Sequence, residues 1–277
     1  MHTEIALAHG LSLKISDAPS GGQPFATSRL QRGLLLVDAG QELAEEAVGF
    51  GVPVLKRGLQ TIFPGEAALT SLHRGSSWDI TALFKLNLVE RFSGAGNETV
   101  ENELFYAAKD FSAAAIRRLP VLGGLLTATS SRLRQMFGWE TTYVDAGFST
   151  EVEVVYSLEE GTGKITVEID SNALPPGITE VVAMNEQGAH HFDRYLDTSG
   201  VCLRGQEIGR WDEVNAEEAW FESRSRRAAF RLGRVKGARL FRGRELVGSR
   251  LAWAGFGYSF PPSMKGLRYQ MRIERLA

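Results

Sequence analysis

Hydrophobic and polar residues alternate along most of this chain. Three ranges show the alternation most clearly: 78–92, 164–170 and 267–274. In the second of these, Ile165 and Val167 alternate with Lys164 and Thr166. A period of two predicts strands with one face in the core and one face in water, which is typical of antiparallel sheets.

One region departs from this period. Over 100–137 the apolar residues follow a helical spacing, and Leu122, Leu126 and Leu133 fall on one stripe. Pro120 separates two predicted helices, about 100–118 and about 121–137. The chain is therefore predicted to be mainly β: one large antiparallel β-sandwich domain over 1–277, supersandwich-like, with a two-helix insertion at 100–137.

Composition narrows the class of protein. The chain has 277 residues, 43% of them hydrophobic, and a formal net charge of −2, so no global field favours nucleic acid as a partner. A single cysteine, Cys202, excludes an intrachain disulfide and favours a cytoplasmic location. The sequence predicts neither a signal peptide nor a membrane span, and it leaves open a homo-oligomer.

The segment 184–195, MNEQGAHHFDRY, concentrates groups that can move protons. We interpret it as a hairpin, with strands over 178–184 and 189–197 and a turn over 185–188. Alternation would then place His191, Asp193 and Tyr195 on one face. A carboxylate beside an imidazole suits acid–base catalysis, with Tyr195 as a second proton donor. The alternative is a hairpin whose polar groups form a structural hydrogen-bond network.

The same hairpin would direct His190 and Arg194 to the opposite face, with Glu186 in the turn. These three residues are candidates for ligand binding. Neighbouring histidines on a strand point apart and chelate one metal ion poorly, so the sequence predicts no metal site and no cofactor.

An arginine-rich stretch follows. Over 224–250 there are ten basic residues and one acid, whereas 205–222 holds six acids and one base. Arginines such as Arg231 and Arg239 could bind an acidic glycan through planar contacts to its anionic groups. Alternatively, pairing of the two segments in a sheet would neutralise them by cross-strand ion pairs.

Trp253 precedes Gly255 and Gly257. Aromatic rings beside glycines can form a surface on which a sugar stacks, although packing in the core is the alternative. We include Trp253 among the candidate ligand-binding residues.

Long one-sided strands, aromatic and arginine-rich sheet faces, and His and Tyr on strands resemble the large β-sandwiches of the galactose mutarotase and polysaccharide lyase group. That resemblance implies a concave sheet face that binds sugar. It also implies acid–base roles that would fall to His191, Asp193 and Tyr195, with an arginine nearby. The helical insertion is a departure from the group.

Two functions follow from these patterns. The first is a carbohydrate-active or carbohydrate-binding protein that uses a concave sheet face, and whether it is an enzyme stays open. The second is a non-enzymatic protein that docks an anionic or protein partner through its Arg-rich strands or its helix pair.

Overall fold

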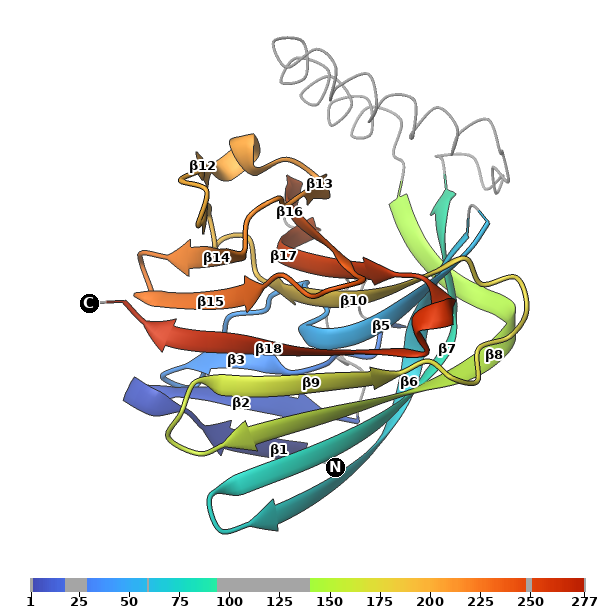
Figure 1. Ribbon diagram of the computed structural model, residues 1–277, viewed down its shortest axis with the longest axis horizontal. Coiled ribbons are helices and arrows are strands. Elements are labelled where there is room, and N and C mark those ends of the chain that lie inside the picture. The colour runs from blue at the N-terminus through green and yellow to red at the C-terminus, as the bar shows by residue number, and fades with distance from the viewer. Residues whose placement is uncertain (1, 18–28, 59, 94–139, 248–250, 277) are drawn as a thin grey trace.

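The computed structural model describes residues 2–17, 29–58, 60–93, 140–247 and 251–276 (Figure 1). Strands dominate these ranges, as the sequence predicts. The predicted two-helix insertion, 100–137, lies outside the described residues. Within them the assigned helical elements are short 3₁₀ turns, such as η1 (Ala8–Gly10) and η4 (Pro262–Met264). No described helix is long and apolar enough to cross a membrane.

The described strands form two antiparallel sheets. The smaller sheet has the order β1-β2-β3-β4 and comprises β1 (His2–Ala6), β2 (Leu11–Ser16), β3 (Leu35–Asp38) and β4 (Gln41–Glu42). Its apolar face joins the same core cluster as the larger sheet.

The larger sheet has fourteen strands in the order β12-β11-β14-β15-β18-β9-β8-β7-β6-β5-β10-β17-β16-β13. Its first nine strands in chain order are β5 (Phe50–Arg57), β6 (Gln60–Arg74), β7 (Ser77–Ser93), β8 (Glu140–Glu159), β9 (Lys164–Asp170), β10 (Glu180–Gln187), β11 (Arg194–Asp197), β12 (Cys202–Arg204) and β13 (Asp212–Glu213). The remaining five are β14 (Glu218–Ser223), β15 (Ala228–Gly233), β16 (Arg239–Val247), β17 (Leu251–Phe260) and β18 (Gly266–Arg275).

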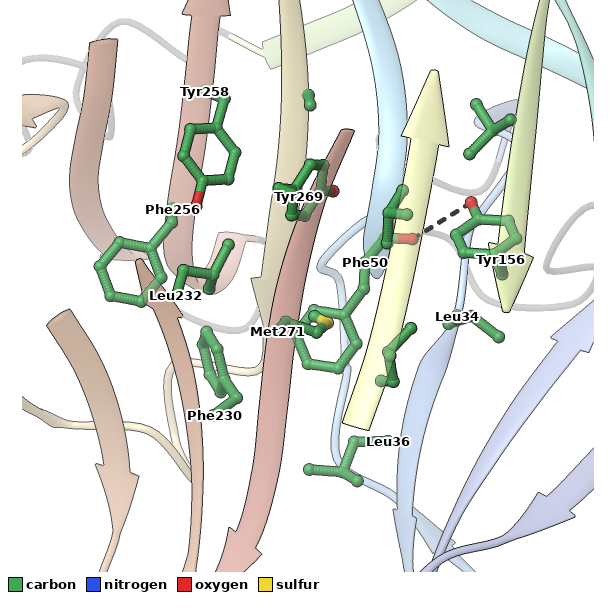
Figure 2. Close-up of a cluster of buried hydrophobic side chains, with 14 of the residues drawn as sticks. Leu34, Leu36, Phe50, Tyr156, Phe230, Leu232, Phe256, Tyr258, Tyr269 and Met271 are labelled. Atoms are coloured by element: carbon green, nitrogen blue, oxygen red, sulfur yellow. Dashed lines mark hydrogen bonds between the residues drawn. The ribbon is translucent and has the colours of Figure 1, made fainter. Parts of the chain in front are cut away.

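The larger sheet folds over on itself. Phe230 on β15 lies 5.2 Å, centroid to centroid, from Phe50 on β5 and 5.8 Å from Phe256 on β17. These strands stand far apart in the strand order, so their contact brings the two halves of one sheet face to face. Figure 2 shows these rings meeting in the shared core, which gives the molecule its β-sandwich character.

The strands predicted from alternation are confirmed. β7, β9 and β18 cover the three alternating ranges, and β9 and β18 alternate buried and exposed positions along their lengths. The apolar residues of each alternating range are therefore the side chains that enter the core.

The predicted hairpin over 178–197 is wrong. The residues expected to form its turn, 185–187, continue strand β10, which pairs with β5 and β17. β11 pairs instead with β12 and β14. Asn185 sits at a register shift between β10 and β5 and is fully buried. Its side chain accepts hydrogen bonds from the Gly51 N–H (3.1 Å) and the Tyr269 hydroxyl (2.8 Å). A polar residue that is typical of a turn is therefore accommodated in the core by buried hydrogen-bond donors.

Candidate functional site

The predicted acid–base set is not brought together. Tyr195 on β11 is fully buried, and its hydroxyl donates to Asp197 Oδ2 at 2.6 Å. Burial and that hydrogen bond raise the pKa of Tyr195 well above its usual value. Arg242 covers the ring, with its guanidinium 4.7 Å from the ring centroid. The Tyr195 side chain is thus committed to the core.

His190 and His191 lie in the turn between β10 and β11, and both approach the same acid. His190 Nδ1 lies 2.8 Å from Glu45 Oε2, and His191 Nε2 lies 3.5 Å from Glu45 Oε1. The prediction that the two rings point apart is wrong because they are not on a strand. Burial lowers the pKa of His191, and the charge of Glu45 partly offsets that effect.

Asp193 and Arg194 have separate surroundings. Asp193 is exposed, and its backbone carbonyl accepts a hydrogen bond from the Gly205 N–H. Arg194 forms an ion pair with Glu222 on β14, at 2.8 Å. His191 therefore interacts with Glu45 rather than with Asp193 as its neighbouring carboxylate.

The arginine-rich strands are largely neutralised, which was the second of the two interpretations. Arg231 on β15 contacts Glu218 at 3.2 Å and Glu274 at 3.1 Å, and its guanidinium lies over Trp220. Further arginines of the same stretch are also paired with acids: Arg234 with Glu217, Arg239 with Glu180, and Arg242 with Asp212.

Three predicted ligand-binding residues do share a surface. β17 lies between β10 and β16, and its residues Trp253, Gly255 and Gly257 face away from the main core, because Ala254 and Phe256 face into it. Glu186 pairs with Gly255 across the sheet. Arg239, on the neighbouring β16, pairs with Ser259 at the far end of the same face and contacts Glu180.

Two tryptophans stack on this face. The ring of Trp211 lies parallel to that of Trp253, with centroids 4.8 Å apart and planes 16° from parallel. Glycines lie beneath them: a Cβ at Gly243 would meet the Trp253 ring at 2.9 Å, and one at Gly257 would meet the Trp211 ring at 3.1 Å. Trp211 itself has a left-handed backbone, with φ of 57°. Larger side chains at either glycine would displace the rings.

Two carboxyl groups border the tryptophans. Glu245 on β16 pairs directly with Trp253 across the sheet and contacts Arg210 at 2.8 Å. Glu186 is buried, and it accepts a long hydrogen bond from the Val48 N–H (3.4 Å). Burial raises the pKa of Glu186 to about 8, the hydrogen bond opposes the rise, and the charge of Glu245 adds to it. Glu186 therefore carries a proton at neutral pH.

We call Trp211, Trp253, Glu186, Glu245 and Arg210 the Trp–Glu face. Strand pairing places a second apolar cluster on the same side of the sheet, formed by Leu30, Val48, Val52, Leu88 and Tyr143, with Met184 packed against it. Burial raises the pKa of Tyr143, and the charges of Glu90, Glu186 and Glu245 add to the effect. This side of the sheet thus combines two stacked aromatic rings, an ion-paired carboxylate and a buried, protonated carboxyl.

In the described part of the chain, no group of three or more His, Cys, Asp or Glu side chains could hold a metal ion. Two pockets occur at another place, around His9 and Arg275, and none of the predicted site residues lines them.

Sequence reasoning missed Glu45, Trp211, Arg210 and Glu245. The glycines beside Trp253 signalled a flat aromatic surface, but they did not reveal that Trp211 stacks on it. Trp211 lies between β12 and β13, and its approach to β17 depends on long-range strand order.

No known protein family and no curated protein matches the chain. Among solved structures, it is similar to the α-N-acetylgalactosaminidase NagBb from Bifidobacterium bifidum, in complex with GalNAc, with 12% identity and a TM-score of 0.52. The match covers 99% of this chain and 36% of that enzyme, so the chain spans about a third of the enzyme's length.

Two further similar structures are a galactose mutarotase-like protein from Clostridium acetobutylicum and a putative aldose 1-epimerase from Klebsiella pneumoniae. The first has 10% identity and a TM-score of 0.39, and covers 100% of this chain and 99% of that one. The second has 8% identity and a TM-score of 0.42, and covers 96% and 77%. At the level of architecture, the predicted resemblance to galactose mutarotase-like proteins is confirmed. The chain is therefore a mainly β protein whose fold resembles part of a glycoside hydrolase.

Proposed function

We propose that this protein binds a neutral sugar on the Trp–Glu face. The observation that carries the proposal is the stacked pair of Trp211 and Trp253, whose ring edges lie over Gly257 and Gly243. An aromatic ring offers an apolar plane to the C–H face of a pyranose, and the neighbouring Arg210 and Glu245 offer hydrogen bonds to its hydroxyls.

Charge favours a neutral ligand. Glu186 is protonated at neutral pH, and the carboxylate of Glu245 is paired with Arg210. Neither glutamate therefore presents an unpaired negative charge to a ligand on the two rings. The Arg210 charge is likewise paired, so it does not strongly attract an anion. The described fold also occurs within an enzyme whose structure contains GalNAc, which is compatible with a sugar ligand.

Acid–base chemistry by His191 with Asp193 has less support, because Asp193 is exposed and His191 contacts Glu45. The rival function, docking of an anionic partner on the Arg-rich strands, has less support because Arg231, Arg234 and Arg242 have acidic partners.

Replacing Trp253 with alanine should weaken sugar binding about tenfold or more, because truncating a buried aromatic anchor costs about 2 kcal/mol of binding free energy. Isothermal titration calorimetry with a panel of neutral mono- and disaccharides provides the measurement. Trp220→Ala is the matched control, since Trp220 lies on β14, beneath Arg231 and away from the proposed face.

The proposal fails if no neutral sugar in the panel binds the wild-type protein. It fails equally if Trp220→Ala weakens binding as much as Trp253→Ala. Trp211→Ala should reproduce the loss, and thermal melting of each variant separates lost binding from lost folding.

A further inference from the structure

A second surface, remote in sequence from the Trp–Glu face, gathers cations around two adjoining pockets. One pocket, of about 210 Å³, is lined by η1, by the turn between β8 and β9, and by the end of β18. The other, of about 250 Å³, shares His9 and Arg275 with it and adds Arg227. We call the two pockets together the basic groove. Each pocket has the volume of about seven or eight water molecules, which is room for a small charged group and part of its carrier.

Two of the cations oppose each other without an acid between them. Lys164 on β9 and Arg272 on β18 are direct cross-strand partners, and both are exposed. Their side chains have no ion-pair partner among the described residues. Like charges placed directly opposite in a sheet are destabilising, so a bound anion would stabilise this pair.

Four residues away on the same two strands, a basic residue faces an acidic one. Arg268 on β18 faces Glu168 on β9, and the two form an ion pair at 2.8 Å. Two acids of this region are already engaged: Glu274, which lines the groove, with Arg231, and Asp38 with Arg275. The cationic charge of Lys164 and Arg272 is thus left available to a ligand.

The backbone around the groove is closely fitted. A Cβ at Gly163 would lie 1.7 Å from the Ile273 carbonyl oxygen, so only glycine lets the β8–β9 turn press against β18. That contact sets Lys164 beside Arg272. On the other side, His9 has a left-handed backbone, with φ of 60°, and its carbonyl oxygen accepts a hydrogen bond from Arg275 Nε at 3.2 Å. Strained residues of this kind persist where surrounding contacts hold them.

From this geometry we propose that the basic groove binds a tetrahedral oxyanion, the phosphate or sulfate ester group of a small molecule, between Lys164 and Arg272. Arginine presents a planar fork of donors and lysine a mobile point charge, and together they complement such a group. The site is independent of neutral-sugar binding on the Trp–Glu face.

The test is calorimetric titration of the full chain with glycerol 3-phosphate, glycerol 3-sulfate, inorganic phosphate and glycerol, because these probes have no pyranose ring to stack on the Trp–Glu face. The two esters should bind, and the tighter of them shows whether the groove prefers phosphate or sulfate. Lys164→Gln with Arg272→Gln should weaken ester binding about tenfold or more, and Arg268→Gln should change it by less than about twofold, because Arg268 lies about 13 Å along the strand. Glycerol itself should not bind, and neutral-sugar binding on the Trp–Glu face should be unchanged in these variants.

Arg272→Glu separates binding from folding. It replaces a like-charge pair with an opposite-charge pair, so the melting temperature should stay the same or rise while ester binding is lost. The proposal is overturned if neither ester binds at millimolar concentration, if Arg268→Gln weakens binding as much as the double substitution, or if Arg272→Glu still binds the esters. Failure of the Trp253→Ala test would leave these outcomes unaffected.

Discussion

The free energy of unfolding of the wild-type protein should fall between about pH 5 and about pH 8.5, and Glu186→Gln should remove most of that fall. The ordinary pKa of this glutamate is 4.5, and burial raises it to about 8 in the folded protein. Below the ordinary value both states are protonated. As the pH rises toward 8, the unfolded chain ionises while the folded protein keeps its proton, so the free energy of unfolding falls. The expected fall is about 2–5 kcal/mol, and the uncharged amide of glutamine has no such dependence.

Chemical denaturation at the two pH values measures this effect. Glu180→Gln on the same strand is a control of opposite sign. Burial alone would raise the pKa of Glu180, but hydrogen bonds from Ser259 and Lys56 outweigh it and lower the pKa. Glu180→Gln should therefore destabilise the protein at neutral pH. The fall in the free energy of unfolding between pH 5 and 8 should be the same as in the wild type. Part of the pH dependence should persist in Glu186→Gln, since burial also raises the pKa of Glu46 from 4.5 to about 7. If the free energy of unfolding of Glu186→Gln falls with pH as steeply as that of the wild type, the burial of a protonated carboxyl at this position is contradicted.

Phe230→Ala should lower the free energy of unfolding by about 3–5 kcal/mol, because a phenylalanine truncated in a close-packed core leaves a cavity. Phe230 is fully buried. It contacts rings from four other segments of the chain: Phe50, Phe192, Phe221 and Phe256. The loss should appear as a lower denaturant midpoint with a normal slope.

The matched control is Leu72→Ala, which truncates a large apolar side chain on β6 that is 47% exposed. Its effect should stay within about 0.5 kcal/mol, as for most surface substitutions. Equal losses in the two variants would mean that the two halves of the large sheet do not pack through Phe230.

The strands were predictable because their signal is local. On β9 and β18 each successive side chain enters the core or the solvent, and the sequence records that choice residue by residue. The antiparallel character followed from the polar second face. Strand order, in contrast, depends on which residues meet across the molecule, and alternation carries no record of it.

In the candidate site, too, local features were predictable and features that depend on strand order were not. Glu186, Trp253 and Arg239 were named from their local patterns, and the order β10-β17-β16 places them on one face. The structure does not bring the predicted acid–base set together, because that grouping depended on a hairpin between β10 and β11. Asn185 to Gln187 resemble a turn in sequence, but their side chains are buried by neighbours from β5 and β17. The charge of the arginine-rich stretch also depended on pairing, which places Glu218 against Arg231.

The central claim, that neutral sugars stack on the Trp–Glu face, is tested most directly by the indole N–H signals of the protein in ¹⁵N NMR. The chain has five tryptophans, so each signal can be assigned by one Trp→Phe substitution. Addition of a bound neutral sugar should shift the signals of Trp211 and Trp253 and leave those of Trp78 and Trp220 in place. Shifts confined to Trp78 or Trp220, or no shift of any indole signal at saturating sugar, would contradict the account.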